Sequence, residues 1–142
     1  KQSNIIKFRQ STYDYIIVDM PPAMNDFTEN VLTICDYVYV PIELGTFAVQ
    51  GLARVTQKIA NAGTKYACFA SKYDKGNKAD QELLEIMKKN LGDKVLNTVI
   101  PFSRAIKNSI SYRITASEYM SWINPARCYE RLANEIIHSV EQ

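Results

Sequence analysis

The chain has 142 residues, of which 46% are apolar, and its net charge is +2. This length and composition are sufficient to bury a core, so we expect a single domain over residues 1–142. No apolar run approaches the roughly 20 residues of a membrane-spanning helix, and the cysteines are odd in number and widely spaced, which excludes a disulfide framework. The first residue is Lys1 and not methionine, which indicates a piece of a longer protein.

Positive charge is concentrated in the middle of the chain. Residues 65–113 carry 10 Lys and Arg against 5 Asp and Glu, whereas the stretches on either side are net negative. A local basic surface attracts phosphate backbones or acidic partners more strongly than the total charge suggests. Lys88 and Lys89 fall on an expected helix, and we interpret them as part of a solvated helix face and not as a binding surface.

Expected strands and helices alternate from the start of the chain. Residues 14–19 are predicted to form a buried strand, and a short helix is expected over 25–35 with Asp26 as its N-cap. A second strand is expected over 37–40 and is stopped by Pro41.

The same alternation continues to the end of the chain. The remaining expected elements are a helix capped by Thr46 and ended by Gly63, a strand over 66–71, a helix before Gly92, a strand over 95–100 stopped by Pro101, and a final helix with Asn124 as N-cap and Pro125 at its first position. The core face predicted for the final helix is Tyr129, Leu132, Ala133, Ile136, Ile137 and Val140. This order predicts an α/β fold, a doubly wound parallel sheet with flanking helices.

Prolines or polar residues follow each expected strand. The segments are Asp19-Met-Pro21-Pro22, Pro41-Ile-Glu43, Tyr73-Asp74 and Pro101-Phe102-Ser103. Ligands of open α/β sheets bind outside the carboxyl ends of the strands, so we expect these segments to line one crevice. An alternative stays open, because prolines also simply stop strands and both aspartates are of a type common in turns.

Conventional catalytic constellations are absent from the sequence. His138 is the only histidine, so no histidine triad or histidine metal cluster can form, and the glycines never form a phosphate-binding loop of the type G-x-x-x-x-G-K-[ST].

An ordered series of short motifs nevertheless resembles one family. The motifs are Tyr13-Asp-Tyr-Ile-Ile-Val-Asp19-Met-Pro-Pro22, Thr28-x-Asn30-x-Leu32, Phe47-Ala48-x-x-Gly51-Leu52, Tyr73-Asp74, Thr98-Val-Ile-Pro101 and Glu118-Tyr119. Together they resemble the ParA/Soj partition ATPases, relatives of MinD with a deviant Walker motif, over nearly the whole chain. The resemblance implies a P-loop NTPase-like fold of the SIMIBI class.

The resemblance also implies a nucleotide site. Asp19 would be the Walker B-type catalytic aspartate, which holds Mg²⁺ through water beside the γ-phosphate of ATP. Residues 20–30, with Pro21 and Pro22, would be the switch that senses ATP. Asn25 would stand in place of the family's switch glycine, and asparagine tolerates the positive φ that the turn would need. Toward the base would lie Asp74, Pro101, Phe102 and Ser103.

Partners follow from the same resemblance. Such proteins form homodimers around ATP, bind DNA non-specifically and respond to a ParB-like stimulating protein in the bacterial cytoplasm, at the nucleoid. DNA contact would fall on Arg104, Lys107 and Arg113, although Ala105 stands where the family has a basic residue. A MinD-like positioning ATPase is an alternative, but we expect no membrane partner because the last helix lacks a basic face.

The family's phosphate loop, K-G-G-x-G-K-[ST], and the aspartate that orients the attacking water have no counterpart in these residues. We therefore expect the intact parent to be a Mg²⁺-dependent ATPase and this chain alone to be inactive, without bound ATP or Mg²⁺. A non-hydrolysing truncated relative that acts as an interaction or regulatory module is the other alternative. In the family, the phosphate-loop strand runs between the strands predicted at 14–19 and 37–40, so here these two must pair together or accept a strand from elsewhere.

Overall fold

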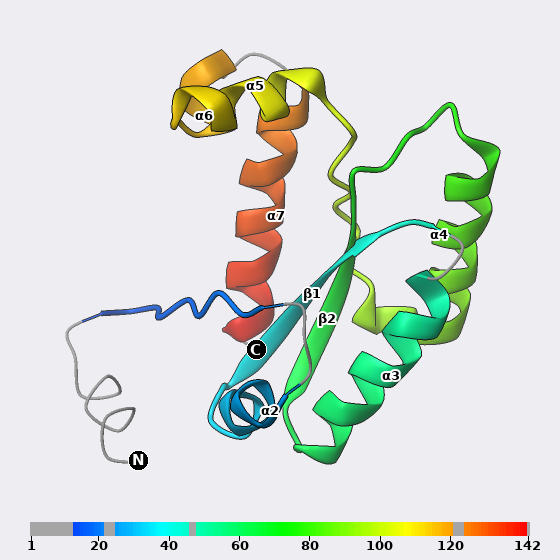
Figure 1. Cartoon of the computed structure of the whole chain (residues 1–142), viewed down its shortest axis with the longest axis vertical. Coiled ribbons are helices and arrows are strands. Elements are labelled where there is room, and N and C mark those ends of the chain that lie inside the picture. Colours follow the sequence, from blue (N-terminus) through cyan, green and yellow to red (C-terminus); the bar gives the residue numbers. More distant parts are fainter. Residues whose placement is uncertain (1–12, 22–24, 46–47, 121–123, 142) are drawn as a thin grey trace.

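The computed structural model describes residues 13–21, 25–45, 48–120 and 124–141. The elements, in chain order, are α2 (Asp26–Leu32), β1 (Tyr37–Glu43), α3 (Ala48–Asn61), β2 (Lys65–Ser71), α4 (Lys78–Leu91), the 3₁₀ helix η1 (Gly92–Lys94), α5 (Arg104–Tyr112), α6 (Ala116–Met120) and α7 (Asn124–Val140) (Figure 1). Within the described ranges, no helix combines the length and the apolar character needed to cross a bilayer.

The sheet is built from β1 and β2, which pair in parallel from Tyr37 opposite Lys65 to Glu43 opposite Ser71. Helix α3 connects them as a crossover, as a parallel pair requires. Figure 1 shows α3 and α4 on one side of this sheet and α7 on the other. The predicted α/β class with a parallel sheet between helices is therefore confirmed.

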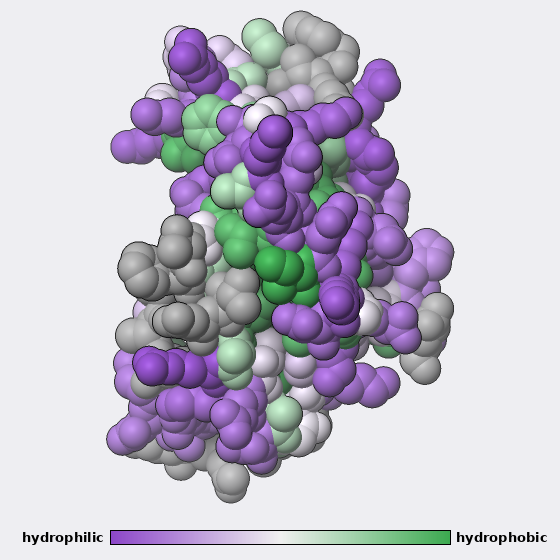
Figure 2. Space-filling model, turned by 90° about the vertical axis from the view of Figure 1, so that its right-hand side faces the viewer, coloured by the Kyte–Doolittle hydropathy of each residue, from purple (hydrophilic) through white to green (hydrophobic). Residues whose placement is uncertain are grey.

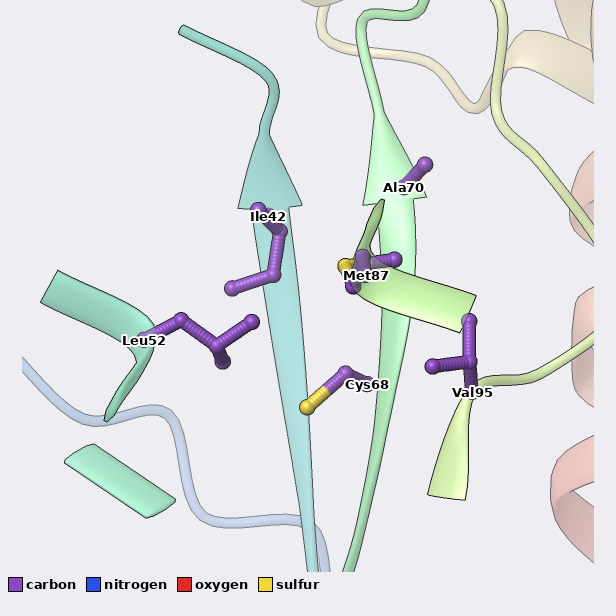
Figure 3. Close-up of a cluster of buried hydrophobic side chains, with 6 residues drawn as sticks. All are labelled: Ile42, Leu52, Cys68, Ala70, Met87 and Val95. Atoms are coloured by element: carbon purple, nitrogen blue, oxygen red, sulfur yellow. The ribbon is translucent and has the colours of Figure 1, made fainter. Parts of the chain in front are cut away.

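Each face of the sheet carries its own apolar cluster. On the α3 and α4 side, Ile42 of β1 and Leu52 of α3 point toward one another (Figure 3), and the cluster is completed by Cys68, Ala70, Met87 and Val95. On the α7 side, the cluster consists of Ala67, Leu96, Ile100, Cys128 and Leu132. Neighbouring residues of β2 thus alternate between the two cores, as a strand buried on both faces requires.

The surface between α3 and α4 is hollowed and mainly apolar. Its lining includes Leu44, Leu52, Leu83 and Met87. Figure 2 shows an apolar band in the middle of this side of the molecule, bordered by hydrophilic residues.

The strand predicted over 95–100 is wrong as a continuous strand. The amide of Leu96 donates to the carbonyl of Cys68 (2.8 Å), and a regular parallel ladder would bring Thr98 to Ala70 next; instead Ile100 donates to Ala70 (2.9 Å). Two additional residues therefore bulge out between these bonds. The amides of Asn97 (2.6 Å) and Thr98 (2.9 Å) donate to the Glu135 carboxylate of α7, which diverts them from the sheet.

The strand predicted over 14–19 is also wrong. Residues 13–21 have no regular secondary structure, and Figure 1 shows them as an extended trace that projects away from the sheet. Ile17 is 94% exposed, and Tyr15, Ile16 and Val18 are exposed as well. A strand needs a neighbouring strand that satisfies its backbone groups. Among the described residues, β1 and β2 form the whole sheet, so residues 14–19 pair with neither strand and one edge of β1 is unpaired.

Helix boundaries correct one expected cap and confirm two expected helix ends. Asn25, and not Asp26, caps α2 by accepting a hydrogen bond from the amide of Thr28 (3.0 Å). Its φ of −118° is extended, so Asn25 does not use the positive φ that asparagine tolerates. The predicted helix ends at Gly63 and Gly92 are confirmed, because these residues have φ of 74° and 54°. The predicted cap Thr46 lies outside the described residues.

Three further expectations need correction. Pro41 does not stop β1 but lies within it, which an edge strand tolerates. Between Pro101 and Asn124, where the sequence predicted no helix, the chain forms α5 and α6. On α7, Cys128, Leu132 and Ile136 face the core, whereas four residues predicted to be buried are not part of it: Tyr129, Ala133, Ile137 and Val140.

Candidate functional site

The loop after β2 is ordered by its own hydrogen bonds. The carboxylate of Asp74 accepts a hydrogen bond from the amide of Gly76 (2.8 Å), and the carbonyl of Asp74 accepts one from the amide of Asn77 (3.0 Å). Asn77 caps α4 by accepting a hydrogen bond from the amide of Ala79 (3.0 Å). Asp74 is therefore a turn residue by its contacts, and its side chain remains exposed.

A buried carboxylate stands behind this loop. Asp80, in the first turn of α4, is 7% exposed. One carboxylate oxygen accepts a hydrogen bond from the amide of Asp74 (2.9 Å), and the other accepts one from the side-chain amide of Asn77 (2.9 Å). Sequence reasoning missed Asp80, although the spacing Asn77-x-x-Asp80 resembles a capping box and could have revealed it.

Main-chain bonds join this loop to the segment that precedes α5. The amide of Tyr73 donates to the carbonyl of Ile100 (3.0 Å), and the amide of Phe102 donates to the carbonyl of Tyr73 (2.9 Å). These bonds form an isolated parallel bridge between Tyr73 and Pro101. Two segments predicted to share a crevice, Tyr73-Asp74 and Pro101-Phe102-Ser103, are thus brought together at the carboxyl end of β2.

The side chains of this second segment have different surroundings. Phe102 is 61% exposed. Ser103 caps α5 by accepting a hydrogen bond from the amide of Ala105 (3.2 Å), so its hydroxyl is committed to the helix end. The edge therefore offers an exposed aromatic ring beside a fixed main-chain bridge.

Asp19 does not join this edge. It is exposed on the segment that projects to the left in Figure 1, whereas the loop after β2 rises on the right. Pro21 is exposed on the same segment, and Pro22 lies outside the described residues. Across the parts of the chain that are described, no three His, Cys, Asp or Glu side chains gather as metal ligands.

The basic residues predicted to contact DNA lie on and after α5. Arg104 and Lys107 are exposed three positions apart, so they share one face of the helix. Arg113 is exposed at the C-cap in a left-handed conformation (φ 57°). Ile110 and Tyr112 are exposed nearby, so this surface combines positive charge with apolar groups.

Helix α6 is fixed to α5 by short-range contacts. The rings of Tyr112 and Tyr119 stack with their centroids 5.5 Å apart. Thr115 and Glu118 form a capping box, in which the amide of Thr115 donates to the carboxylate (2.8 Å) and the amide of Glu118 donates to the hydroxyl (3.1 Å). The hydrogen bonds from the amide and the hydroxyl of Thr115 lower the pKa of Glu118.

Glu135 supports the segment that leads to Pro101. Burial alone would raise the pKa of Glu135, but the hydrogen bonds from Thr98 and Asn97 outweigh burial and lower this pKa. The carboxylate is therefore ionised at neutral pH while it holds the bulge. Sequence reasoning missed this residue too, because the carboxylate and the amides it binds are far apart in the sequence.

Comparison with known proteins adds a decisive similarity. The chromosome-partitioning ATPase Soj of Treponema pallidum is 33% identical over 135 residues, which cover 90% of this chain. The chain is a relative of the ParA/Soj proteins. The chromosome partitioning protein ParA of Caulobacter vibrioides is 26% identical over 88% of the chain. A family model described as an AAA domain matches residues 2–69.

A solved structure supports the same architecture. A plasmid partition protein from Borrelia burgdorferi has a TM-score of 0.60 over 84% of this chain, at 22% identity, and 52% of that protein is covered. This match shows a shared fold. The chain spans about half the length of the ParA/Soj relatives it matches, with 53% of the Treponema protein and 49% of the Caulobacter protein covered.

Proposed function

We propose that this chain is the carboxy-terminal half of a ParA/Soj-type partition ATPase. The intact protein binds ATP with Mg²⁺, forms a homodimer around the nucleotide and binds DNA non-specifically in the bacterial cytoplasm, at the nucleoid. A ParB-like protein stimulates its hydrolysis. The observation that carries the proposal is the similarity to Soj over 90% of the chain. The Tyr73–Pro101 bridge supports it by joining two segments that the resemblance assigns to one ligand site.

The base of the nucleotide lies against the bridged edge. The segments that carry Asp74 and Pro101 are joined there by main-chain bonds of Tyr73 to Ile100 and Phe102, and Ser103 lies at the start of α5. Phe102 is exposed beside them, and an aromatic ring suits the flat apolar face of a purine. Asp74 remains exposed to solvent and can accept hydrogen bonds from the nucleotide.

The phosphates and the metal lie on the Asp19 side, with Pro21 and Pro22 in the switch. Mg²⁺ keeps several waters and is commonly held by one or two carboxylates together with substrate phosphates. Among the described residues, Asp19 belongs to no group of three metal-ligating side chains. Its exposed carboxylate therefore fits a metal that it would hold through water, and does not fit a metal held by described protein ligands alone. Mg²⁺ supplies charge neutralisation between the phosphates when it is bound.

The other half of the protein supplies the phosphate loop. The 142 residues contain no phosphate-loop motif, so nothing in them cradles the phosphates with backbone amides and a lysine. The edge of β1 that no other described strand pairs with provides a place for the strand that carries this loop. The isolated chain is therefore proposed to be inactive as an ATPase.

DNA binding falls on the α5 surface. Arg104 and Lys107 lie on one exposed face, and Arg113 follows at the helix end. Contacts from such side chains to the phosphate backbone are independent of base sequence and weaken as salt rises.

One experiment tests the function. ATP binding and hydrolysis are measured on this chain and on a version extended upstream in the gene, with and without Mg²⁺ and DNA. We expect binding and slow hydrolysis by the extended protein only. An extended protein that binds ATP without turnover would favour the non-hydrolysing interaction module, and one that binds anionic vesicles in preference to DNA would favour a MinD-like positioning ATPase. An extended protein that binds no nucleotide would refute the proposal.

A further inference from the structure

Asp80 is a buried carboxylate, and each of its two oxygens accepts a hydrogen bond from the fold. At 7% exposure it would lose most of its hydration, and a buried carboxylate is tolerated only where hydrogen bonds compensate. Both oxygens have such bonds, to the amide of Asp74 and to the side chain of Asn77. The first turn of α4 adds the favourable field of a helix N-terminus. Hydrogen bonds to the loop between β2 and α4 therefore replace the hydrogen bonds that Asp80 would make to water.

That loop needs restraint. Lys72, at its start, has a φ of 54°, a left-handed conformation that a lysine adopts at an energetic cost. The loop is held at its far end when the side-chain amide of Gln81 donates to the carbonyl of Lys75 (2.7 Å). Asp80 holds the middle of the loop at Asp74.

The restraint continues into the candidate site. The residue before Asp74 is Tyr73, whose amide and carbonyl bond to Ile100 and Phe102. A short chain of contacts thus runs from Asp80 to Asp74, along the backbone to Tyr73, and across the bridge to Phe102. Loss of the Asp80 bond would loosen both segments of the edge together.

We propose that Asp80 is a positioning residue for the base side of the nucleotide site. This inference rests on the function proposed above, because it takes the Asp74 and Pro101 edge to face the base. Asp80 does not touch the nucleotide. It fixes the loop that does, and so contributes to affinity for the base and not to affinity for the phosphates.

A reciprocal substitution separates positioning from the mere presence of a charge. In Asp80→Asn, the side chain has one acceptor oxygen in place of two, so it can no longer accept hydrogen bonds from both the Asp74 amide and the Asn77 side chain, and its hold on Asp74 weakens. In the double variant N77D/D80N, the amide group introduced at position 80 is expected to donate to the carboxylate introduced at position 77. The oxygen of the side chain introduced at position 80 then accepts a hydrogen bond from the Asp74 amide. Position 80 is thus again hydrogen-bonded both to Asp74 and to position 77. Aspartate is as good an N-cap as asparagine, so the cap of α4 persists. Asp93→Asn, at an exposed position of η1, is the matched control.

The experiment uses the upstream-extended protein with two probes, ATP and inorganic tripolyphosphate, which lacks base and sugar. We expect D80N to weaken ATP binding about tenfold, the change that follows when the loss of a hydrogen bond of about 1.4 kcal/mol leaves the loop in its binding position about one tenth of the time. Tripolyphosphate binding is expected to stay unchanged, N77D/D80N to restore ATP affinity, and D93N to change neither. Amide hydrogen exchange at Asp74 is measured on the same samples, and D80N is expected to accelerate it.

Each other outcome is decisive. Equal losses for ATP and tripolyphosphate would show a general structural role and overturn the inference. Unchanged ATP affinity, or unchanged exchange at Asp74, would overturn it while leaving the proposed function intact. A wild-type extended protein that binds neither probe would overturn the proposed function and, with it, this inference.

Discussion

Replacing Glu135 by alanine is expected to destabilise the fold by about 2 kcal/mol. The carboxylate accepts hydrogen bonds from the amides of Asn97 and Thr98, and a hydrogen bond to a charged group contributes about 1.5–3 kcal/mol. Asn97 is exposed, so water replaces much of its lost bond, whereas Thr98 is half-buried and recovers less. The expected loss of about 2 kcal/mol therefore corresponds to little more than one full hydrogen bond to a charged group.

Urea unfolding measures this loss as a lower midpoint with an unchanged slope. For a slope of about 1–3 kcal/mol/M, the midpoint falls by about 1 M. Glu135→Gln keeps one acceptor and is expected to lose about 1 kcal/mol. Glu130→Ala, at an exposed position of the same helix, is the control and should change little.

The pH dependence has a definite sign. Because the folded-state pKa of Glu135 lies below its ordinary value of 4.5, the ionised carboxylate contributes stability above that value. This contribution is lost as the pH falls through the folded-state pKa. The difference between wild type and Glu135→Gln should therefore shrink in acid. If Glu135→Ala costs no more than Glu130→Ala, or if the difference persists undiminished in acid, the reasoning is wrong.

Three further predictions test other features. The double change Arg104→Glu and Lys107→Glu should weaken DNA binding by the extended protein and reduce the slope of log affinity against log salt by about 2; fluorescence anisotropy across a salt series measures this, and the same charge change at Lys88 and Lys89 should matter less. Gly63→Ala should lower the free energy of unfolding by about 1 kcal/mol in urea, because the φ of Gly63 is 74°. Gly51→Ala, in mid-helix with open space around the added Cβ, should raise it by about 0.5–1 kcal/mol. Equal effects of the two substitutions would contradict the assigned helix end. Asn25→Ala should cost about 1 kcal/mol through the lost N-cap, while Asp26→Ala should cost clearly less, and the reverse order in thermal or urea unfolding would restore Asp26 as the cap.

Local signals in the sequence predicted part of the fold well. The strand at β2 is a run of apolar residues between turn signals, and its burial on both faces needs only its own neighbours. Gly63 and Gly92 end α3 and α4 because glycine alone adopts their φ without strain. The alternation of these elements was enough to predict a parallel sheet.

The errors arise where the outcome depends on residues far away. Residues 14–19 have the composition of a buried strand, but composition supplies no partner for backbone groups. Residues 95–100 also have the composition of a buried strand. Two of their amides, however, donate hydrogen bonds to Glu135, which lies on a helix remote in the sequence. The same limit applies to the candidate site. Turn and proline signals predicted that Asp74 and Pro101 share an edge, but the Asp80 carboxylate that holds it was recognised only from the fold.

The unpaired edge of β1 has a practical consequence for anyone who expresses this chain by itself. Among the described residues, one edge of the apolar strand β1 has no paired strand, and Tyr15, Ile16, Ile17 and Val18 are exposed. Both features promote cross-β association between copies. Yield in soluble form should then depend on concentration and improve with a charged gatekeeper such as Ile17→Lys, which lies outside both apolar clusters. If the proposed function is right, co-expression with the upstream half should raise the soluble yield by occupying the same edge.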